Sequence, residues 1–170
     1  MKNKVCVLLI ICLIATTILG LFFWALHQHL RTTNDISCMP DINALSIDGY
    51  DIHVNEYLDP QKRTAVVFFH PECEFCQQEI DGIINKYSEC HNVQWVFLTL
   101  ASSDEINVFL IDYPILTIPN SYVIREDWPN ICRKLNFTAP PEMLIYDKNG
   151  KLIKNHKGAT SIRTIVEELQ

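Results

Sequence analysis

The sequence predicts an α/β fold in which a mixed β-sheet is covered by helices on both faces and is preceded by one transmembrane helix. Apolar runs at 64–69 and 93–100 are typical of strands that are buried on both faces. A segment with apolar residues at helical spacing follows the first run. Two further strands, at 142–146 and 151–156, are joined by a turn at 148–150. Strands that alternate with helices and end in a hairpin indicate a sheet between two helical layers.

Local signals place the remaining elements. The turn Asp48-Gly49 joins two short strands within 39–58. Ser102 and Glu105 have the spacing of a capping box, which begins a helix that runs to about Asp112. The other expected elements are a helix over 74–88, an extended segment over 115–124, a short helix over 128–135 and an amphipathic helix over 160–169.

The N-terminal segment is long and apolar enough to cross a membrane. Residues 5–26 carry no charge, and about 20 apolar residues span a hydrocarbon core as a helix. Because Lys2 and Lys4 precede the segment, the positive-inside rule places the N-terminus in the cytoplasm. The bulky residues at 21–24 do not make the small-residue cleavage site of a signal peptide. We expect a single-pass inner-membrane protein with an anchor over 1–26, a tether over 27–37 and a periplasmic domain over 38–170.

Composition and charge exclude several classes of function. Hydrophobic residues make up 48% of the 170 residues, which is enough for the core of one domain. A formal net charge of −6 and the lack of any Lys/Arg run argue against binding to nucleic acid or to anionic lipid. Two of the seven cysteines lie in the anchor, and the other five cannot all pair within one chain.

Cys73 and Cys76 form a Cys-x-x-Cys motif where a buried strand gives way to a helix. The unpaired N–H groups and the dipole of a helix N-terminus favour a thiolate on Cys73. Cys76 lies within reach to resolve a mixed disulfide, so the motif predicts thiol–disulfide exchange. A static disulfide is an alternative. So is a zinc site that includes Cys90 and His91, although such sites usually carry a second Cys-x-x-Cys or a spaced His pair.

Three segments in the correct order resemble the TlpA/ResA-type membrane-anchored thioredoxin-like proteins, a redoxin (AhpC/TSA-like) family. MPDINALSIDGYDIHVNEYL resembles the N-terminal hairpin of that family, CEFCQQE its active-site block, and PPEMLIYDKNG its cis-proline loop, strand and turn. The resemblance covers nearly all of 38–170. It implies a thioredoxin-like fold and a monomeric thiol–disulfide oxidoreductase that needs no cofactor. Its expected partners are protein disulfide or dithiol substrates and a redox protein at the membrane.

The same resemblance assigns roles to individual residues. Cys73 is expected to be the attacking thiol, Cys76 the resolving thiol, and Glu79 a carboxylate that handles protons beside them. An ordinary exposed helix residue is the alternative for Glu79. Pro141 is expected to be the cis-proline that faces the cysteines, and Pro140 to dock an extended substrate. Because proline has no N–H, Pro140 offers that substrate only its carbonyl.

Two departures from the family bear on the chemistry. Glu72 stands where many members have a tryptophan, so a docking role for that ring is lost. Val67 stands at the position of the buried aspartate of thioredoxins. Glu79 is therefore the best candidate for moving protons near Cys76.

The charges around Cys73 predict the direction of electron flow. Glu72 and Glu74 flank this thiol and Glu79 lies close by, so a further negative charge is disfavoured there. Strong oxidants of this fold stabilise their reduced thiolate. We therefore expect the opposite behaviour, a couple that donates electrons to disulfides.

Two other functions remain open on the sequence. A Cu(I) chaperone of the Sco kind would use the two cysteines with His70 or His156, although its cysteines are normally separated by three residues. A non-catalytic anchored module would use the same fold for protein binding. The cysteines expected to stay free thiols are Cys38, Cys90 and Cys132.

Overall fold

The computed structural model describes residues 12–25, 34–126 and 128–169. The chain divides into two units, Met1–Asn34 and Asp35–Gln170. The first unit is helical over 12–25. The apolar segment at 5–26 lies partly outside the described residues, and within them no helix is both long and apolar enough to span a bilayer. The membrane anchor stays a prediction.

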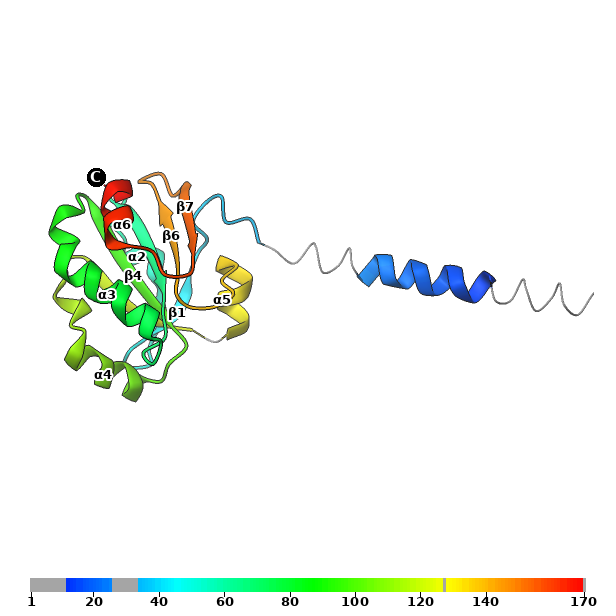
Figure 1. Ribbon diagram of the computed structural model, residues 1–170, viewed down its shortest axis with the longest axis horizontal. Coiled ribbons are helices and arrows are strands. Elements are labelled where there is room, and N and C mark those ends of the chain that lie inside the picture. The colour runs from blue at the N-terminus through cyan, green and yellow to red at the C-terminus, as the bar shows by residue number, and fades with distance from the viewer. Residues whose placement is uncertain (1–11, 26–33, 127, 170) are drawn as a thin grey trace, which may run out of the picture. The chain divides into compact units, whose positions relative to one another are not determined.

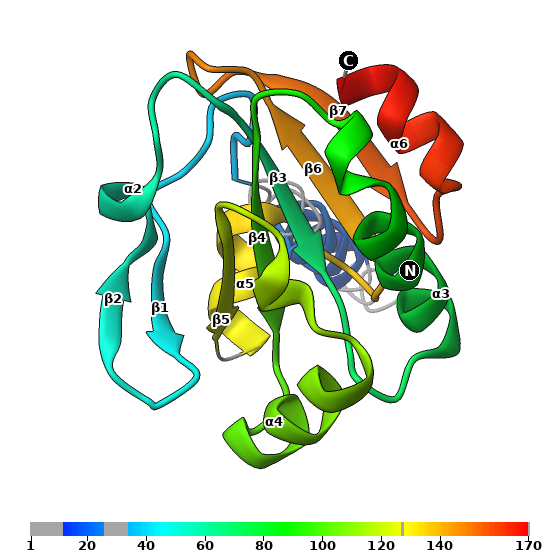
Figure 2. The same cartoon turned by 90° about the vertical axis from the view of Figure 1, so that its left-hand side faces the viewer.

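The second unit is built around a single mixed sheet (Figures 1 and 2). In the described part of the chain the sheet has seven strands in the order β2-β1-β5-β4-β3-β6-β7. The strands are β1 (Asn43–Ser46), β2 (Asp51–His53), β3 (Arg63–Phe68), β4 (Val93–Thr99), β5 (Ser121–Arg125), β6 (Glu142–Tyr146) and β7 (Leu152–Lys157). The helices are α2 (Val54–Tyr57), α3 (Glu74–Lys86), α4 (Ser103–Asp112), α5 (Trp128–Leu135) and α6 (Ile162–Leu169), with 3₁₀ turns η1 (Tyr87–Glu89) and η2 (Ile115–Thr117).

The centre of the sheet consists of the two strands that the apolar runs predicted. β3 pairs with β4 in parallel, and β4 pairs with β5 in parallel. β6 joins β3 antiparallel, and β7 continues antiparallel from β6. Every residue of β4 is buried, as expected for a strand covered on both faces. This confirms the mixed α/β sheet.

Two apolar cores lie on opposite faces of this sheet. One contains Val67 and Phe69 together with buried residues of α3, α4 and α6. The other contains Val66 and Phe68, where the ring of Phe68 stacks on Phe137 with centroids 5.1 Å apart. Alternate residues of one strand thus supply both cores, because successive strand side chains point to opposite faces.

Two segments differ from the prediction. The second strand of the N-terminal hairpin ends at His53, and Val54–Tyr57 form the short helix α2. The helical turn lets Val54 enter the core and lets the Asn55 side chain accept the Ile42 N–H at 3.0 Å. The segment at 115–124 is also not extended throughout. It begins with η2 after Pro114, whose missing N–H cannot join a strand ladder.

Candidate active site

Cys73 is held at the first turn of α3 by the loop that follows β3. It is the N-cap residue of the helix, and its Sγ accepts the Cys76 N–H at 3.3 Å. The Cys73 N–H donates to the His70 carbonyl at 3.0 Å, and the Gln77 side chain donates to the Pro71 carbonyl at 2.7 Å. Cys73 itself stays partly exposed. An accessible sulfur therefore sits at the N-terminus of α3 and accepts one of the helix N–H groups that has no partner within the helix.

Cys76 lies in a different environment although it is one turn away. It is only 1% exposed and packs into the core with Ile80. Burial, the hydrogen bond to Cys73 and the negative charge of Glu79 all raise the pKa of the Cys76 thiol. Both thiols are free. Only Cys73 is open to an external disulfide, so Cys76 is suited to an intramolecular step.

Glu79 is buried beneath this pair, at 5% exposure, so it is not an ordinary exposed helix residue. Its Oε2 accepts the Thr160 N–H at 2.7 Å, and its Oε1 has no hydrogen-bond partner among the described residues. Burial raises the pKa of the carboxyl, while the Thr160 N–H and His156 act in the opposite direction. A buried carboxyl with one hydrogen-bond donor takes up a proton more readily than an exposed glutamate does.

The loop before β6 faces Cys73. The Pro140–Pro141 peptide bond is cis, as the sequence predicted, and the Cys73 Sγ lies 4.0 Å from the Pro140 carbonyl oxygen. The Pro141 carbonyl accepts the Gly158 N–H at 2.9 Å. The loop therefore presents one backbone acceptor beside the accessible thiol.

Sequence reasoning missed Glu142, which fixes this loop from below. The residue is 2% exposed, and its Oε1 accepts the N–H groups of Thr138 at 2.7 Å and Ala139 at 3.0 Å, together with the Thr138 hydroxyl. A carboxylate directly after two prolines and before an apolar strand was the available signal. Buried charges of this kind are expected only where several donors meet them.

The family model for the thioredoxin-like domain matches residues 50–170. This chain belongs to the thioredoxin-like family. A search of curated protein sequences finds no match.

Solved structures share the thioredoxin-like fold at low sequence identity. A secreted Mycobacterium tuberculosis disulfide oxidoreductase homologous to E. coli DsbE gives a TM-score of 0.62 at 17% identity, covering 76% of this chain and 94% of that chain. StoA from Bacillus subtilis gives 0.59 at 14%, covering 79% and 99%. BsSco, a member of the Sco family of cytochrome c oxidase assembly proteins, gives 0.59 at 11%, covering 81% and 94%. These likenesses show the fold and include disulfide oxidoreductases.

Within this thioredoxin-like domain Phe75 is an exposed apolar residue of α3. The ring is 63% exposed, whereas Ile80 and Ile83 on the same helix are fully buried. The buried stripe of α3 runs through Cys76, Ile80 and Ile83, and Phe75 lies about 100° around the helix from Cys76. An apolar ring is thus left in solvent between the two cysteines.

Two other thiols of the domain, Cys38 and Cys90, lie apart from the Cys73–Cys76 pair. Cys38 is exposed and lies in an isolated β-bridge with Lys151. Cys90 is half-buried against the core, and burial and Glu89 raise the pKa of its thiol. Both are free. The side chain of Cys132 lies outside the described part of the chain.

The histidines considered as copper ligands have other contacts. His70 Nδ1 accepts the Glu72 N–H at 3.3 Å, and His156 Nε2 lies 2.6 Å from Glu168 Oε2. Over the residues that the structure describes, no group of three or more His, Cys, Asp or Glu side chains is placed to hold a metal ion. The zinc ligand set considered from the sequence, which included Cys90 and His91, is therefore not brought together.

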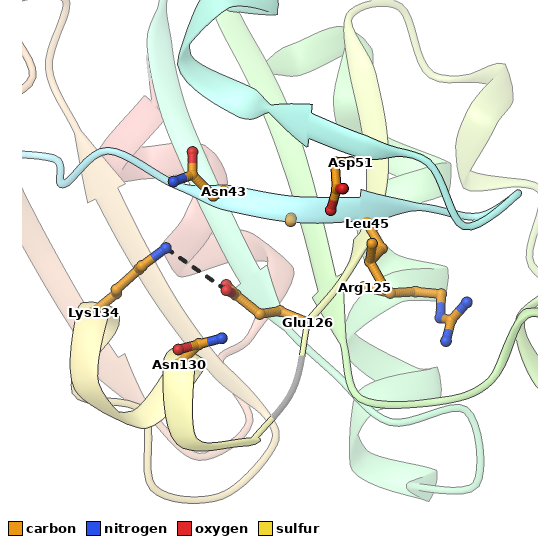
Figure 3. A pocket seen from close by; sticks show the side chains of 8 residues that line it. Asn43, Leu45, Asp51, Arg125, Glu126, Asn130 and Lys134 are labelled. Carbon is orange, nitrogen blue, oxygen red and sulfur yellow. Dashed lines mark ion pairs between the residues drawn. The ribbon is translucent and has the colours of Figure 1, made fainter.

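A separate pocket of about 350 Å³ lies between β1, β5 and α5 (Figure 3). Its charged side chains serve the fold. Lys134 and Glu126 point toward one another, with 3.7 Å between Nζ and Oε1. Arg125 points away and donates to the Ala101 carbonyl at 3.1 Å. The pocket contains none of the thiols and is not part of the candidate active site.

Proposed function

We propose that this chain is a thiol–disulfide oxidoreductase that exchanges the Cys73–Cys76 dithiol with disulfides of proteins. The observation that carries the proposal is the asymmetry of the two thiols. Cys73 is accessible and receives a helix N–H, whereas Cys76 is buried beside the carboxyl of Glu79. A structural disulfide or a binding surface requires no such difference, but a two-step exchange does.

In the first step the Cys73 thiolate attacks one sulfur of a substrate disulfide. A mixed disulfide forms between Cys73 and the substrate, the substrate S–S bond breaks, and one substrate thiolate leaves. The Pro140 carbonyl lies near the attacking sulfur and can accept a backbone N–H from an extended substrate segment. Phe75 offers an apolar contact beside it.

In the second step Cys76 releases the substrate. Because burial disfavours its thiolate, Cys76 needs a base. Glu79 is the carboxylate whose negative charge acts on the Cys76 thiol and raises its pKa. Glu79 takes the proton, the Cys76 sulfur attacks the Cys73 sulfur, and the second substrate thiolate leaves. Two electrons pass in total from the dithiol to the substrate disulfide. Glu79 passes the Cys76 proton to the departing thiolate, and the thiolate released in the first step takes its proton from water. A further redox protein at the membrane returns the electrons to the chain.

We place the reaction in the reducing direction and outside the cytoplasm. Burial disfavours a thiolate on Cys76, and Glu72 and Glu74 add exposed negative charge around Cys73. The apolar segment at 5–26 after Lys2 and Lys4 supports an inner-membrane anchor with the domain on the periplasmic side. The protein is proposed to act there as a monomer.

The proposal is tested by reduction of insulin disulfides with the full chain and a dithiol electron donor. Cys73→Ser should reduce the rate to the uncatalysed background, and Cys38→Ser, which removes an exposed free thiol, should leave it unchanged. An unchanged rate in Cys73→Ser contradicts the proposal. Titration of the reduced chain with Cu(I) identifies a copper-binding function in that event.

A further inference from the structure

A second pair of titratable side chains lies behind Glu79. His156 on β7 places its Nε2 2.6 Å from Oε2 of Glu168 on α6. The other oxygen of Glu168 lies 3.1 Å from the ammonium of Lys154, which is half-exposed. His156 and Glu168 are themselves 18% and 17% exposed, so their contact is largely shielded from water. A shielded contact of this kind interacts more strongly than a surface pair.

The sheet directs His156 to the face that carries the active-site helix. Its register partner on β6 is Met143, and Met143 packs in the core that contains Cys76 and Ile80. Directly opposed residues of antiparallel strands point to the same face, so His156 lies on the α3 side of the sheet. α6, which carries Glu168, packs against the same core.

The segment that carries His156 also holds the Glu79 carboxylate. Thr160, four residues after His156, donates its N–H to Glu79 Oε2 at 2.7 Å, while the buried Oε1 has no partner among the described residues. The charged form of His156 lowers the pKa of the Glu79 carboxyl and opposes the effect of burial. The end of β7 and the loop after it therefore carry the two groups that lower the pKa of the Glu79 carboxyl, His156 and the Thr160 N–H.

We propose that His156, held by Glu168, is a positioning residue whose positive charge sets the pH range in which Glu79 can take the proton of Cys76. The proposal rests on the proposed function, which makes Glu79 the base. The charged groups around His156 are Glu168 on α6, which it contacts, Lys154 on β7, which contacts the same carboxylate, and Glu79 on α3, on which its charge acts.

The direction of the expected shift in the Glu79 titration follows because charge and burial act on this carboxyl in opposite directions. Burial favours the protonated form of Glu79, and the His156 cation favours the carboxylate. His156→Gln removes the cation and keeps a polar side chain of similar length. The titration midpoint of Glu79 should then rise by about half a pH unit or more. The acidic limb of the pH–rate profile for the second exchange step should move upward with it. His156→Lys restores a cation and should bring both values back.

The test measures Glu79 directly by ¹³C NMR titration of its carboxyl in the full chain, assigned by comparison with Glu79→Gln. The rate of the second step is followed in parallel as the decay of a preformed mixed disulfide. Glu167→Gln is the matched control, because it removes the neighbouring carboxylate of α6 from an exposed pair with Arg163. This control should leave the Glu79 titration midpoint and the acidic limb of the pH–rate profile unchanged.

A Glu79 midpoint that is the same in His156→Gln as in the unaltered chain overturns this inference and leaves the proposed function standing. A midpoint that moves without the rate profile also overturns it. Should His156→Gln fail to fold, the unaltered chain still decides: the Glu79 carboxyl and the His156 imidazole must each show the inflection of the other. Independent single titrations would contradict the inference.

Discussion

Two buried glutamates support the candidate active site, one below the cis-proline loop and one on α3, and their surroundings differ. Glu142, below the cis-proline loop, gathers two N–H groups and a hydroxyl on one oxygen. Glu79, on the second turn of α3, has one N–H donor on one oxygen, and its other oxygen has no partner among the described residues. Glu142 is thus tied into the loop by several hydrogen bonds, whereas Glu79 has a single donor and burial raises the pKa of its carboxyl.

This difference assigns the two residues to different tasks. Glu142 keeps the loop that bears Pro140 against Cys73 through its hydrogen bonds to Thr138 and Ala139. Burial disfavours the charged form of Glu79, so its carboxyl accepts a proton more readily than an exposed carboxyl does. Substitutions at the two positions should therefore change different properties of the protein.

The largest expected effect is on the rate of the second exchange step. Glu79→Gln keeps an acceptor for the Thr160 N–H but cannot take a proton from Cys76. The decay of a preformed mixed disulfide should slow by about 100-fold or more at neutral pH. Stopped-flow measurement of substrate release gives this rate. Asp81→Asn, an exposed carboxylate two residues on, is the control and should be unaffected. Equal rates in Glu79→Gln and the control would remove Glu79 from the mechanism.

The next effect is on stability and concerns Glu142. Glu142→Ala leaves the donors of Thr138 and Ala139 without their acceptor, and the free energy of unfolding should fall by about 1–3 kcal/mol. Glu142→Gln keeps one acceptor oxygen and should cost less. Urea denaturation measures both values, and the Glu79 titration midpoint should not move in either variant. A stability loss in Glu79→Gln as large as that in Glu142→Ala would erase the distinction between the two residues.

A smaller effect is expected at the exposed ring beside the thiols. Phe75→Ala should lower kcat/KM for a protein disulfide by about three- to tenfold, because a docking substrate covers this apolar surface. The free energy of unfolding should change by less than about 0.5 kcal/mol. Ile80→Ala, on the buried stripe of the same helix, should instead cost about 2–5 kcal/mol. If Phe75→Ala also lowers kcat/KM for a small disulfide that has no aromatic group, the ring does not act by docking the protein substrate.

The smallest effect is a pH dependence of stability. Because the folded-state pKa of Glu79 is raised, the folded chain binds the proton more tightly than the unfolded chain does. This contribution is therefore fully present at pH below the ordinary carboxyl range and is lost as the pH rises through the raised pKa. The difference in unfolding free energy between the unaltered chain and Glu79→Gln, followed from pH 4 to 8, isolates it. A difference that grows more favourable to the unaltered chain with rising pH would show that the sign is wrong.

The sequence predicted those parts of the site that depend on local signals. The family resemblance supplied the cis-proline at Pro141. The Cys-x-x-Cys pair at a strand–helix junction and the Ser102/Glu105 capping box are set by neighbours within a few residues. The apolar runs likewise predicted β3 and β4. Such features need no knowledge of the distant chain.

The features that the sequence did not predict depend on contacts between distant segments of the chain. The partner of Glu79 is Thr160, which is 81 residues away, so the burial of Glu79 could not be read from its own helix. Phe75 is exposed although it is apolar, because the buried stripe of α3 begins at Cys76. The helix α2 arose where Asn55 reaches back to the Ile42 N–H, a contact that strand propensity does not contain. Tertiary structure decided each of these positions.

The central claim, that Cys73 attacks and Cys76 resolves, is tested most directly by trapping. The reduced Cys76→Ser chain is mixed with a disulfide-bonded protein, and the covalent product is mapped by mass spectrometry under non-reducing conditions. The account predicts a stable mixed disulfide on Cys73, and no mixed disulfide on Cys76 in Cys73→Ser, because the buried Cys76 cannot reach an external sulfur. A mixed disulfide on Cys76, or none on Cys73, would contradict it.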